Sequence, residues 1–189
     1  MSEVSNQISI KAVLLGSTFV GKTAIFHRLK NEVYTDPNPT IQADHCKLNV
    51  IKNNKNYGIL LFDTAGQERF QSITPGYCRG ADLVILVFSL IDQISFDDCK
   101  NRWKTLINNN CPRDPFIILV ANKSDCATNI SDEDIESLKK ELNANVAIKT
   151  SAINGDNIDE LRSLMAIDNT IIDGLPPKSD NNDDPGKCC

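Results

Sequence analysis

The sequence has few aromatic residues, no long apolar run and no excess of basic side chains. Aromatic residues make up 6% of the 189 residues, and the formal net charge is -5. A nucleic-acid-binding face needs surplus Lys and Arg to replace phosphate counterions, so this composition disfavours that function. The longest apolar stretches, Leu83–Leu90 and Phe116–Ala121, fall far short of the roughly 20 residues of a membrane-spanning helix. Proteins and small molecules are therefore the expected partners, with no nucleic acid, and the chain is expected to be a monomer.

Export signals and paired cysteine motifs are also missing. The segment Met1–Gln7 has no basic stretch followed by an apolar core, so no secretory signal is predicted and a cytosolic location is expected. The cysteines in the body of the chain show no CxxC spacing and no histidine cluster, which favours reduced thiols over disulfides or a zinc site. These residues are Cys46, Cys78, Cys99, Cys111 and Cys126.

The order of apolar and polar segments predicts one α/β domain over residues 8–174. A strand at Ile8–Leu15 runs into a glycine loop and a helix at Thr23–Lys30, and a hairpin is expected at His45–Ile51 and Tyr57–Phe62. Strands and helices then alternate, which predicts a mostly parallel sheet with helices on both faces and ligands at the carboxyl ends of its strands. The alternating elements are Leu83–Phe88, Ser95–Asn109, Phe116–Ala121, Ser131–Leu142, Val146–Thr150 and Ile158–Ile172.

Three helix starts carry the spacing of a capping box, and the end of the sequence carries no periodic pattern. The capping pairs are Ser95 with Asp98, Ser131 with Asp134, and Asn157 with Glu160. Residues 175–189 are rich in Pro, Asp, Asn and Lys, and they are expected to form a flexible tail.

The glycine loop fits the phosphate-loop pattern, and it lies between a strand and a helix, where that pattern has physical meaning. Its residues are Gly16, Ser17, Thr18, Phe19, Val20, Gly21, Lys22 and Thr23. Backbone N–H groups and the positive end of the helix can hold phosphate here. Lys22 is expected to contact the β and γ phosphates, and the Thr23 hydroxyl to bind Mg2+. An ordinary glycine turn at a helix start is the simpler alternative, which the strand context disfavours.

Two further segments predict recognition of guanine. Asn122, Lys123, Ser124 and Asp125 follow a strand, and the Asp125 carboxylate can accept both the N1–H and the 2-amino group of guanine. Adenine offers neither donor, so an unpaired carboxylate penalises the wrong base. Ser151 and Ala152 follow the last strand, where the Ala152 N–H can donate to guanine O6. Each motif is weak alone, because a polar turn has the same composition, but their order along the chain favours the joint interpretation.

The segment that begins at Asp63 predicts the hydrolytic part of the site. Asp63 ends an apolar strand and can hold Mg2+ through water, the Gly66 N–H can reach the γ phosphate, and Gln67 can orient the attacking water. Thr40, in a loop with two prolines, can complete the metal site; its role depends on the other motifs, because a threonine in such a loop is usually only a turn residue.

These motifs together resemble the Ras-like small GTPases over residues 8–172, and within them the Rab family that marks vesicle membranes. The most specific stretch runs from Asp63 to Phe70, followed by Gln71–Thr74 and Tyr77–Ala81. The resemblance implies a P-loop fold with a six-stranded, mostly parallel sheet, one antiparallel edge strand and helices on both faces. It also implies GTP and GDP as bound nucleotides, Mg2+ with Thr23 and Thr40 as ligands, and Lys123 packed along the base.

The same resemblance implies a switch with a slow intrinsic GTPase rate, regulating vesicle traffic by recruiting effectors in the GTP state. Exchange factors, activating proteins and GDP-dissociation-inhibitor or escort proteins are then its partners. The adjacent Cys188 and Cys189 resemble a double geranylgeranylation site, which would let the protein cycle from the cytosol onto an intracellular membrane. The acidic tail offers no polybasic support for that binding.

The sequence departs from the family at several positions. Tyr34 stands where the family places an aromatic against guanine, and Thr40 comes one residue early, so the first switch loop is shortened. The hydrophobic triad that Rab partners contact would be His45, Phe62 and Tyr77, although all three could serve packing alone. Phe19 occupies a position where small residues are usual, and its ring would either shield the phosphates and slow nucleotide release or strain the loop.

Two other functions remain open at this point. A degenerate module could hold guanine nucleotide and recruit partners without useful turnover, although Gln67, Thr40 and Asp63 favour hydrolysis. A P-loop kinase or ATPase is disfavoured, because the Asn122–Asp125 motif selects guanine.

Overall fold

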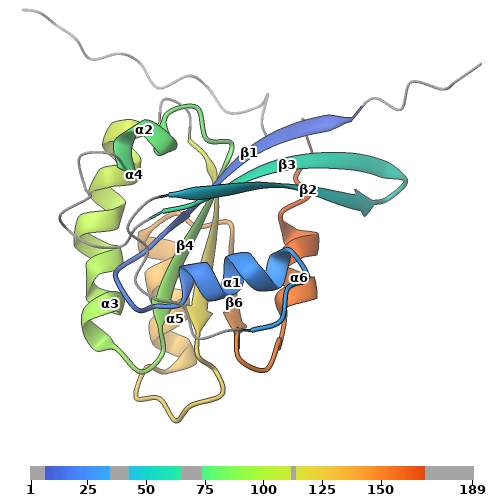
Figure 1. Ribbon diagram of the computed structural model, residues 1–189. Coiled ribbons are helices and arrows are strands. Elements are labelled where there is room, and N and C mark those ends of the chain that lie inside the picture. The colour runs from blue at the N-terminus through green and yellow to red at the C-terminus, as the bar shows by residue number, and fades with distance from the viewer. Residues whose placement is uncertain (1–6, 35–42, 65–73, 112–113, 169–189) are drawn as a thin grey trace, which may run out of the picture.

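A six-stranded sheet in the order β2-β3-β1-β4-β5-β6 forms the centre of the molecule, and helices surround it (Figure 1). The computed structural model describes residues 7–34, 43–64, 74–111 and 114–168. Only the edge strand β2 runs antiparallel, against β3, while the other neighbours pair in parallel. The predicted fold class is therefore confirmed. The strands are β1 (Ile8–Leu15), β2 (Asp44–Lys52), β3 (Lys55–Asp63), β4 (Leu83–Ser89), β5 (Phe116–Asn122) and β6 (Val146–Thr150).

The predicted hairpin is β2 and β3, and its turn is tighter than the sequence suggested. Lys52 pairs with Lys55, which leaves Asn53 and Asn54 as the two turn residues. Both have positive φ, 51° and 59°, which a type I′ turn requires and which asparagine tolerates better than most residues. The turn geometry therefore extends both strands beyond the expected ranges.

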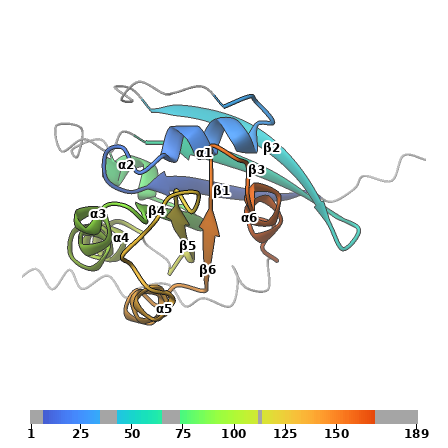
Figure 2. The ribbon, with the colours of Figure 1, turned by 90° about the horizontal axis from the view of Figure 1, so that it is seen from below.

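Apolar side chains of the central strands alternate between two cores on the two faces of the sheet. Leu14 packs with α1 (Lys22–Leu29) and α6 (Ile158–Leu164) on one face, whereas its neighbour Leu15 packs with the other helices on the opposite face. The helices of the second face are α2 (Thr74–Cys78), α3 (Gln93–Asp98), η2 (Cys99–Trp103), α4 (Lys104–Asn110) and α5 (Asp132–Glu141). Figure 2 shows the two groups of helices separated by the sheet. Strands buried on both faces explain the continuous apolar runs in the sequence.

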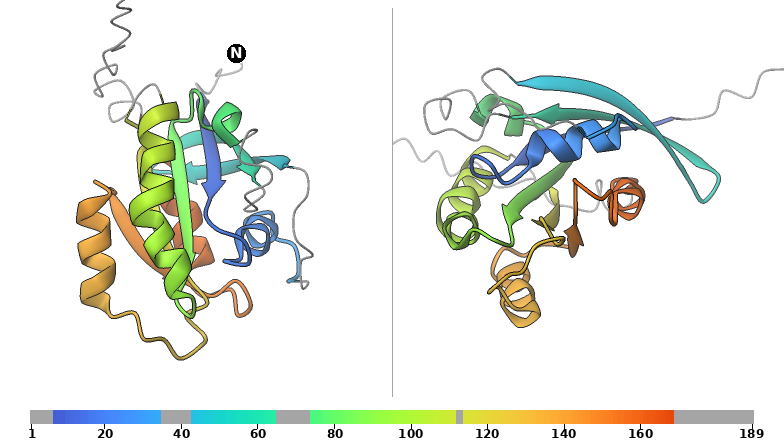
Figure 3. Two further views of the ribbon diagram at one scale, coloured as in Figure 1. Left: turned by 90° about the vertical axis from the view of Figure 1, so that its left-hand side faces the viewer. Right: turned by 60° about the horizontal axis from the view of Figure 1, so that its bottom comes forward.

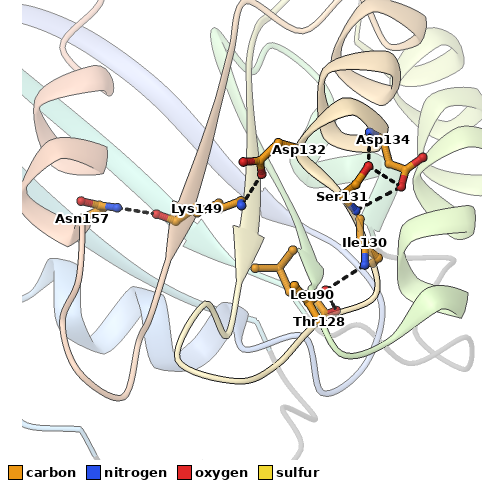
Figure 4. Close-up of polar contacts among 8 residues, drawn as sticks. All are labelled: Leu90, Thr128, Ile130, Ser131, Asp132, Asp134, Lys149 and Asn157. Carbon is orange, nitrogen blue, oxygen red and sulfur yellow. Dashed lines mark hydrogen bonds and ion pairs between the residues drawn. The ribbon is translucent and has the colours of Figure 1, made fainter.

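One of the three predicted capping boxes is confirmed and two predictions are wrong. The Ser131 hydroxyl accepts from the Asp134 N–H, and the Asp134 carboxylate accepts from the Ser131 N–H, as Figure 4 shows. Helix α3 begins two residues before Ser95, because the Asp92 carboxylate caps it by accepting from the N–H groups of Ile94 and Ser95. Asn157 has a φ of 58° and donates its amide to the Lys149 carbonyl, so it makes no side-chain cap.

Two predicted helices differ from the structure along their length. The helix expected at Ser95–Asn109 is present, but its middle is the π-helical turn η2, so α3, η2 and α4 follow one another without a gap. The last helix ends at Leu164, because the chain then bends so that Asp168 accepts hydrogen bonds from Lys55 and Tyr57 on β3. No helix within the described ranges is long and apolar enough to cross a bilayer.

Candidate functional site

Most of the predicted site residues lie at the edge of the sheet where the parallel strands end. The loops after β1, β5 and β6 leave this edge together, and the end of β3 lies beside the end of β1, where Leu14 pairs with Asp63 (Figure 1). The Thr64 hydroxyl donates to the Leu14 carbonyl at 2.6 Å and so fixes the chain as it leaves β3. Motifs separated by more than a hundred residues are thereby brought to one side of the molecule.

The loop after β1 has two glycines that no other residue could replace without displacing neighbours. At Gly16, with φ of 144°, an added Cβ would lie 2.1 Å from the Val87 carbonyl oxygen. At Gly21, with φ of 98°, it would lie 2.2 Å from the Asn122 amide nitrogen. The loop is thus pressed against β4 on one side and against the end of β5 on the other. Glycine at these two positions allows both the close approach of the loop to its neighbours and the positive φ.

Phe19 lies in the middle of this loop with a left-handed backbone and an outward side chain. Its φ is 63°, which costs an L residue with a Cβ roughly 1–2 kcal/mol. The side chain is 71% exposed, so it gains little from packing against the described residues. The backbone at Phe19 therefore carries this cost, while both alternatives for the ring, shielding of phosphate and strain on the loop, stay predictions.

Lys22 begins α1 and turns its ammonium back over the loop. Its Nζ donates to the carbonyl oxygens of Gly16 at 2.9 Å and Ser17 at 2.8 Å. Burial, against the opposing effect of the Asp63 carboxylate and with a smaller contribution from the nearby Arg102, lowers the pKa of Lys22 to about 8. A buried, partly desolvated cation that is already held against the loop is positioned for a polyanionic ligand.

Thr23 and Asp63 form the second polar centre, next to Lys22. The Thr23 hydroxyl donates to Asp63 Oδ2 at 2.7 Å, which joins the start of α1 to the end of β3. Asp63 is 1% exposed, and burial raises the pKa of its carboxyl despite the opposing effects of Thr23 and Lys22. Its other oxygen, Oδ1, has no hydrogen-bond partner among the described residues. A buried carboxylate oxygen of this kind fits a hard cation.

The Asn122 amide connects three segments of the site. Its Nδ2 donates to the Val20 carbonyl at 2.8 Å, and its Oδ1 accepts from the Thr150 hydroxyl at 3.1 Å and the Ala152 N–H at 3.2 Å. Asn122 itself is 1% exposed. One buried side chain therefore holds the loop after β1 in register with the loop after β6.

The predicted guanine-facing groups are also brought together. The Ser151 hydroxyl donates to Asp125 Oδ1 at 2.6 Å, and this hydrogen bond is the main reason that the pKa of Asp125 lies below its ordinary value. Asp125 is exposed at the sheet edge, where its carboxylate stays available to a ligand. Lys123 has a φ of 67°, so the chain makes a left-handed step directly after β5.

Residues that the sequence reasoning did not single out hold the base-facing loops in place. The Thr128 hydroxyl donates to the Leu90 carbonyl and accepts from the Ile130 N–H, as Figure 4 shows, while Lys149 on β6 pairs with Asp132 on α5. The contacts of Thr128 with Leu90 and of Lys149 with Asp132 join residues far apart in the sequence, so no local pattern signals them.

Arg28 on α1 was missed for the same reason. Its Nε donates to the Ala152 carbonyl at 2.8 Å, its Nη2 donates to the Ile153 carbonyl, and its guanidinium lies over the Tyr34 ring. Tyr34 is thereby placed on the same side as the loop after β6, which agrees with its expected position near a base. Its contact with guanine stays a prediction.

Several predicted residues lie outside the described ranges. Among them are the switch residues Thr40, Gly66 and Gln67 and the cysteines Cys188 and Cys189. Their roles stay predictions. The five body cysteines form no disulfide bond within the described ranges, in agreement with the expectation.

The three residues of the expected partner-binding triad form a row of rings across β2, β3 and α2. His45 stacks on Phe62 with ring centroids 5.8 Å apart, and Phe62 meets Tyr77 at 5.4 Å. His45 is exposed and the other two rings are half-buried. The row therefore remains available for contact.

Comparison with known proteins agrees with this arrangement. The model of the Ras family matches residues 11–170. The chain is 38% identical to Ras-related protein SEC4 of Saccharomyces cerevisiae, over 83% of this chain and 73% of the relative. It is 33% identical to GTP-binding protein ypt3 of Schizosaccharomyces pombe, over 79% and 71%, and 32% identical to Ras-related protein Rab-12 of Mus musculus, over 80% and 63%. The chain therefore belongs to the Ras family, as a Rab-like small GTPase.

Proposed function

We propose that this GTPase is a GDP/GTP switch that uses the sheet-edge site for the nucleotide and recruits effectors in its GTP state. The observation that carries the proposal is the Asn122 amide, which holds the phosphate loop at Val20 and the base loop at Ala152 in one arrangement. A nucleoside diphosphate or triphosphate has a base at one end and phosphates at the other, and the ribose limits how far apart the two ends can lie. A site whose phosphate loop and base loop are both hydrogen-bonded to the buried Asn122 side chain suits that ligand.

Guanine recognition is assigned to Asp125, Ser151 and Ala152. The Asp125 carboxylate is oriented by the Ser151 hydroxyl and can accept two donors from one base edge. The Ala152 N–H, which donates to Asn122 Oδ1 in the structure, would be shared between that oxygen and guanine O6 when the base is bound, with Asn122 and Lys123 completing the surroundings of the base. The phosphates are assigned to the N–H groups of Ser17–Thr23 and to Lys22, at the N-terminus of α1.

Mg2+ is assigned to Thr23, to Asp63 through water, and to Thr40. The hydrogen bond between Thr23 and Asp63 places a hydroxyl and a carboxylate at the same point, and the unpartnered Asp63 Oδ1 supports a cation there. Phosphate oxygens and water would supply the remaining ligands, as Mg2+ prefers. Bound Mg2+ would neutralise charge on the β and γ phosphates.

Regulation of membrane traffic and lipid anchoring belong to the same proposal. The row His45, Phe62 and Tyr77 is assigned to partner proteins, and its histidine would alter which partners fit. Gln67 is assigned to the attacking water and Gly66 to the γ phosphate. Prenylation of Cys188 and Cys189 would carry the protein from the cytosol onto an intracellular membrane, because two lipids give stable anchoring where one does not.

The test of this proposal is base preference. Asp125→Asn should weaken GDP binding and favour xanthosine diphosphate, because the new amide donates to the 2-oxo group of xanthine and no longer accepts from guanine. Competition of both nucleotides against fluorescent GDP measures the preference. Asp156→Asn, an exposed carboxylate in the loop after β6, is the matched control. Unchanged preference in Asp125→Asn would contradict the assignment of the base site.

A further inference from the structure

The side chain of Ser17, in the phosphate loop, is held from outside the loop by the long helix of the opposite face. Its hydroxyl donates to Asp98 Oδ2 at 2.5 Å and accepts from the Trp103 indole N–H at 3.2 Å. Trp103 is 1% exposed and Asp98 is half-buried. Figures 1 and 3 show the loop after β1 running beside α3, where these contacts lie. Both hydrogen-bonding functions of this hydroxyl are therefore used by one helix.

The π-helical turn η2 makes this double contact possible. Asp98 and Trp103 are five positions apart, a spacing that places side chains roughly 140° apart around an α-helix. In η2 the hydrogen bonds span five residues, as the Lys104 N–H donating to the Cys99 carbonyl shows, so residues five apart lie one turn apart on the same side. The extra residue of the turn thus aligns an acceptor and a donor on one hydroxyl.

The loop that receives this support is strained, and it carries the ammonium that faces phosphate. Phe19, two residues after Ser17, has its left-handed backbone at a cost of roughly 1–2 kcal/mol. The Ser17 carbonyl accepts from Lys22 Nζ at 2.8 Å. Ser17 is therefore fixed through its side chain to the helix and through its backbone to Lys22. Loss of the side-chain contacts would release the strained segment and the lysine together.

We propose that Asp98 and Trp103, aligned by the π turn, are positioning residues that hold Ser17 and thereby keep the phosphate loop in its nucleotide-binding conformation. The proposal rests on the assignment of Ser17–Thr23 to phosphate made above. It predicts that loosening this contact speeds the release of GDP, because the bound conformation of the loop becomes less populated.

The sign of the effect separates positioning from simple electrostatics. Asp98 carries a negative charge near a site for phosphate, so charge repulsion alone predicts slower GDP release from both Asp98→Ala and Asp98→Asn. Positioning predicts the reverse for Asp98→Ala, which removes the acceptor. Asp98→Asn keeps an acceptor oxygen in the same place and should restore release close to the wild-type rate.

The experiment measures release of fluorescent GDP from the full chain at fixed Mg2+. Asp98→Ala should release GDP about three- to tenfold faster than wild type, the range expected from the net contribution of one ordinary hydrogen bond. Asp97→Ala is the matched control, because this neighbouring carboxylate is exposed and its contacts in the described part of the chain are with Gln93 and Lys100 of the same helix. Ser17→Ala should match Asp98→Ala, and the double variant should be no faster than either single one.

Trp103 adds a direct spectroscopic signal, because it is the only tryptophan in the sequence. Ser17→Ala removes the acceptor of its indole N–H and should shift its emission, and release of GDP from wild type should change that emission at the same rate as the fluorescent nucleotide departs. A merely structural role for Asp98 would lower the thermal midpoint without changing the release rate.

The outcomes are distinct. Wild-type protein that retains no GDP would overturn the site assignment and this inference together. If wild type retains GDP but Asp98→Ala releases it at an unchanged or slower rate, the inference alone is overturned. The same follows if the double variant releases GDP faster than either single variant, because the two effects are then independent.

Discussion

Replacement of Asn122 by alanine should be the most damaging single change at the site outside the glycines. It removes a buried amide and leaves three groups without their partner: the Val20 carbonyl, the Thr150 hydroxyl and the Ala152 N–H. Each lies where water has little access, since Val20 and Thr150 are both 0% exposed and Ala152 is 4% exposed. The perturbation therefore differs from the loss of three surface hydrogen bonds.

The magnitude follows from those three groups. An unsatisfied buried donor or acceptor costs about 1–3 kcal/mol, so three of them give roughly 3–9 kcal/mol before relaxation. Water entering the space of the lost amide recovers part of this, which leaves an expected loss of about 3–5 kcal/mol in the free energy of unfolding. For a domain of this size, each kcal/mol shifts the midpoint by roughly 2–4 °C, so the midpoint should fall by about 10 °C.

The assay is thermal unfolding at saturating GDP and Mg2+, because bound ligand itself stabilises the folded state. Thr150→Val is the graded comparison: it removes one donor while Asn122 Oδ1 keeps the Ala152 N–H, and it should cost about 1 kcal/mol. Asn109→Ala, an exposed asparagine on α4, should change the free energy by less than about 0.5 kcal/mol. An Asn122→Ala midpoint as high as that of Asn109→Ala would refute the reasoning.

Three further predictions concern the ligand, turnover and the tail. Burial lowers the pKa of Lys22 to about 8, and bound phosphate would raise it, so binding of GDP takes up a proton. GDP affinity should therefore fall about fourfold from pH 7 to pH 8.5. Titrations of wild type at both pH values test this, with Lys22→Met as a control whose affinity should not depend on pH in this range. Gln67→Leu should slow single-turnover hydrolysis with little change in GTP affinity, since its contact matters mainly in the transition state, and equal rates would favour a switch that turns over without this residue. Removal of Cys188 and Cys189 should leave GDP binding intact and move the protein from membranes to the cytosol in fractionated cells, so continued membrane association would contradict prenylation as the anchor.

Local chemistry in the sequence was enough to predict the fold and to place most of the expected site residues at one edge of the sheet. The motif Gly16–Thr23 between a strand and a helix, the alternation that follows Leu83, and the polar residues directly after β5 and β6 all depend on near neighbours in the chain. The carboxyl ends of parallel strands must meet at one edge, so placing the loops of Lys22 and Asp125 at the same edge of the sheet required no structure. The boundaries of β1 and β6 were also predicted correctly, because short apolar runs between turn residues have little freedom.

The tertiary structure decided the features that depend on contacts between distant residues. Asp92 rather than Ser95 caps α3, and α6 ends early because Asp168 is drawn to Lys55 and Tyr57. The spacing of apolar residues cannot distinguish a regular α-helix from a helix that contains a π turn, because only tertiary contacts stabilise the extra residue of the turn. The support of Ser17 by Asp98 and Trp103 joins positions 81 and 86 residues apart in the sequence. Such hydrogen bonds form only after the sheet has brought the loop and the helix together, so no local pattern could predict them.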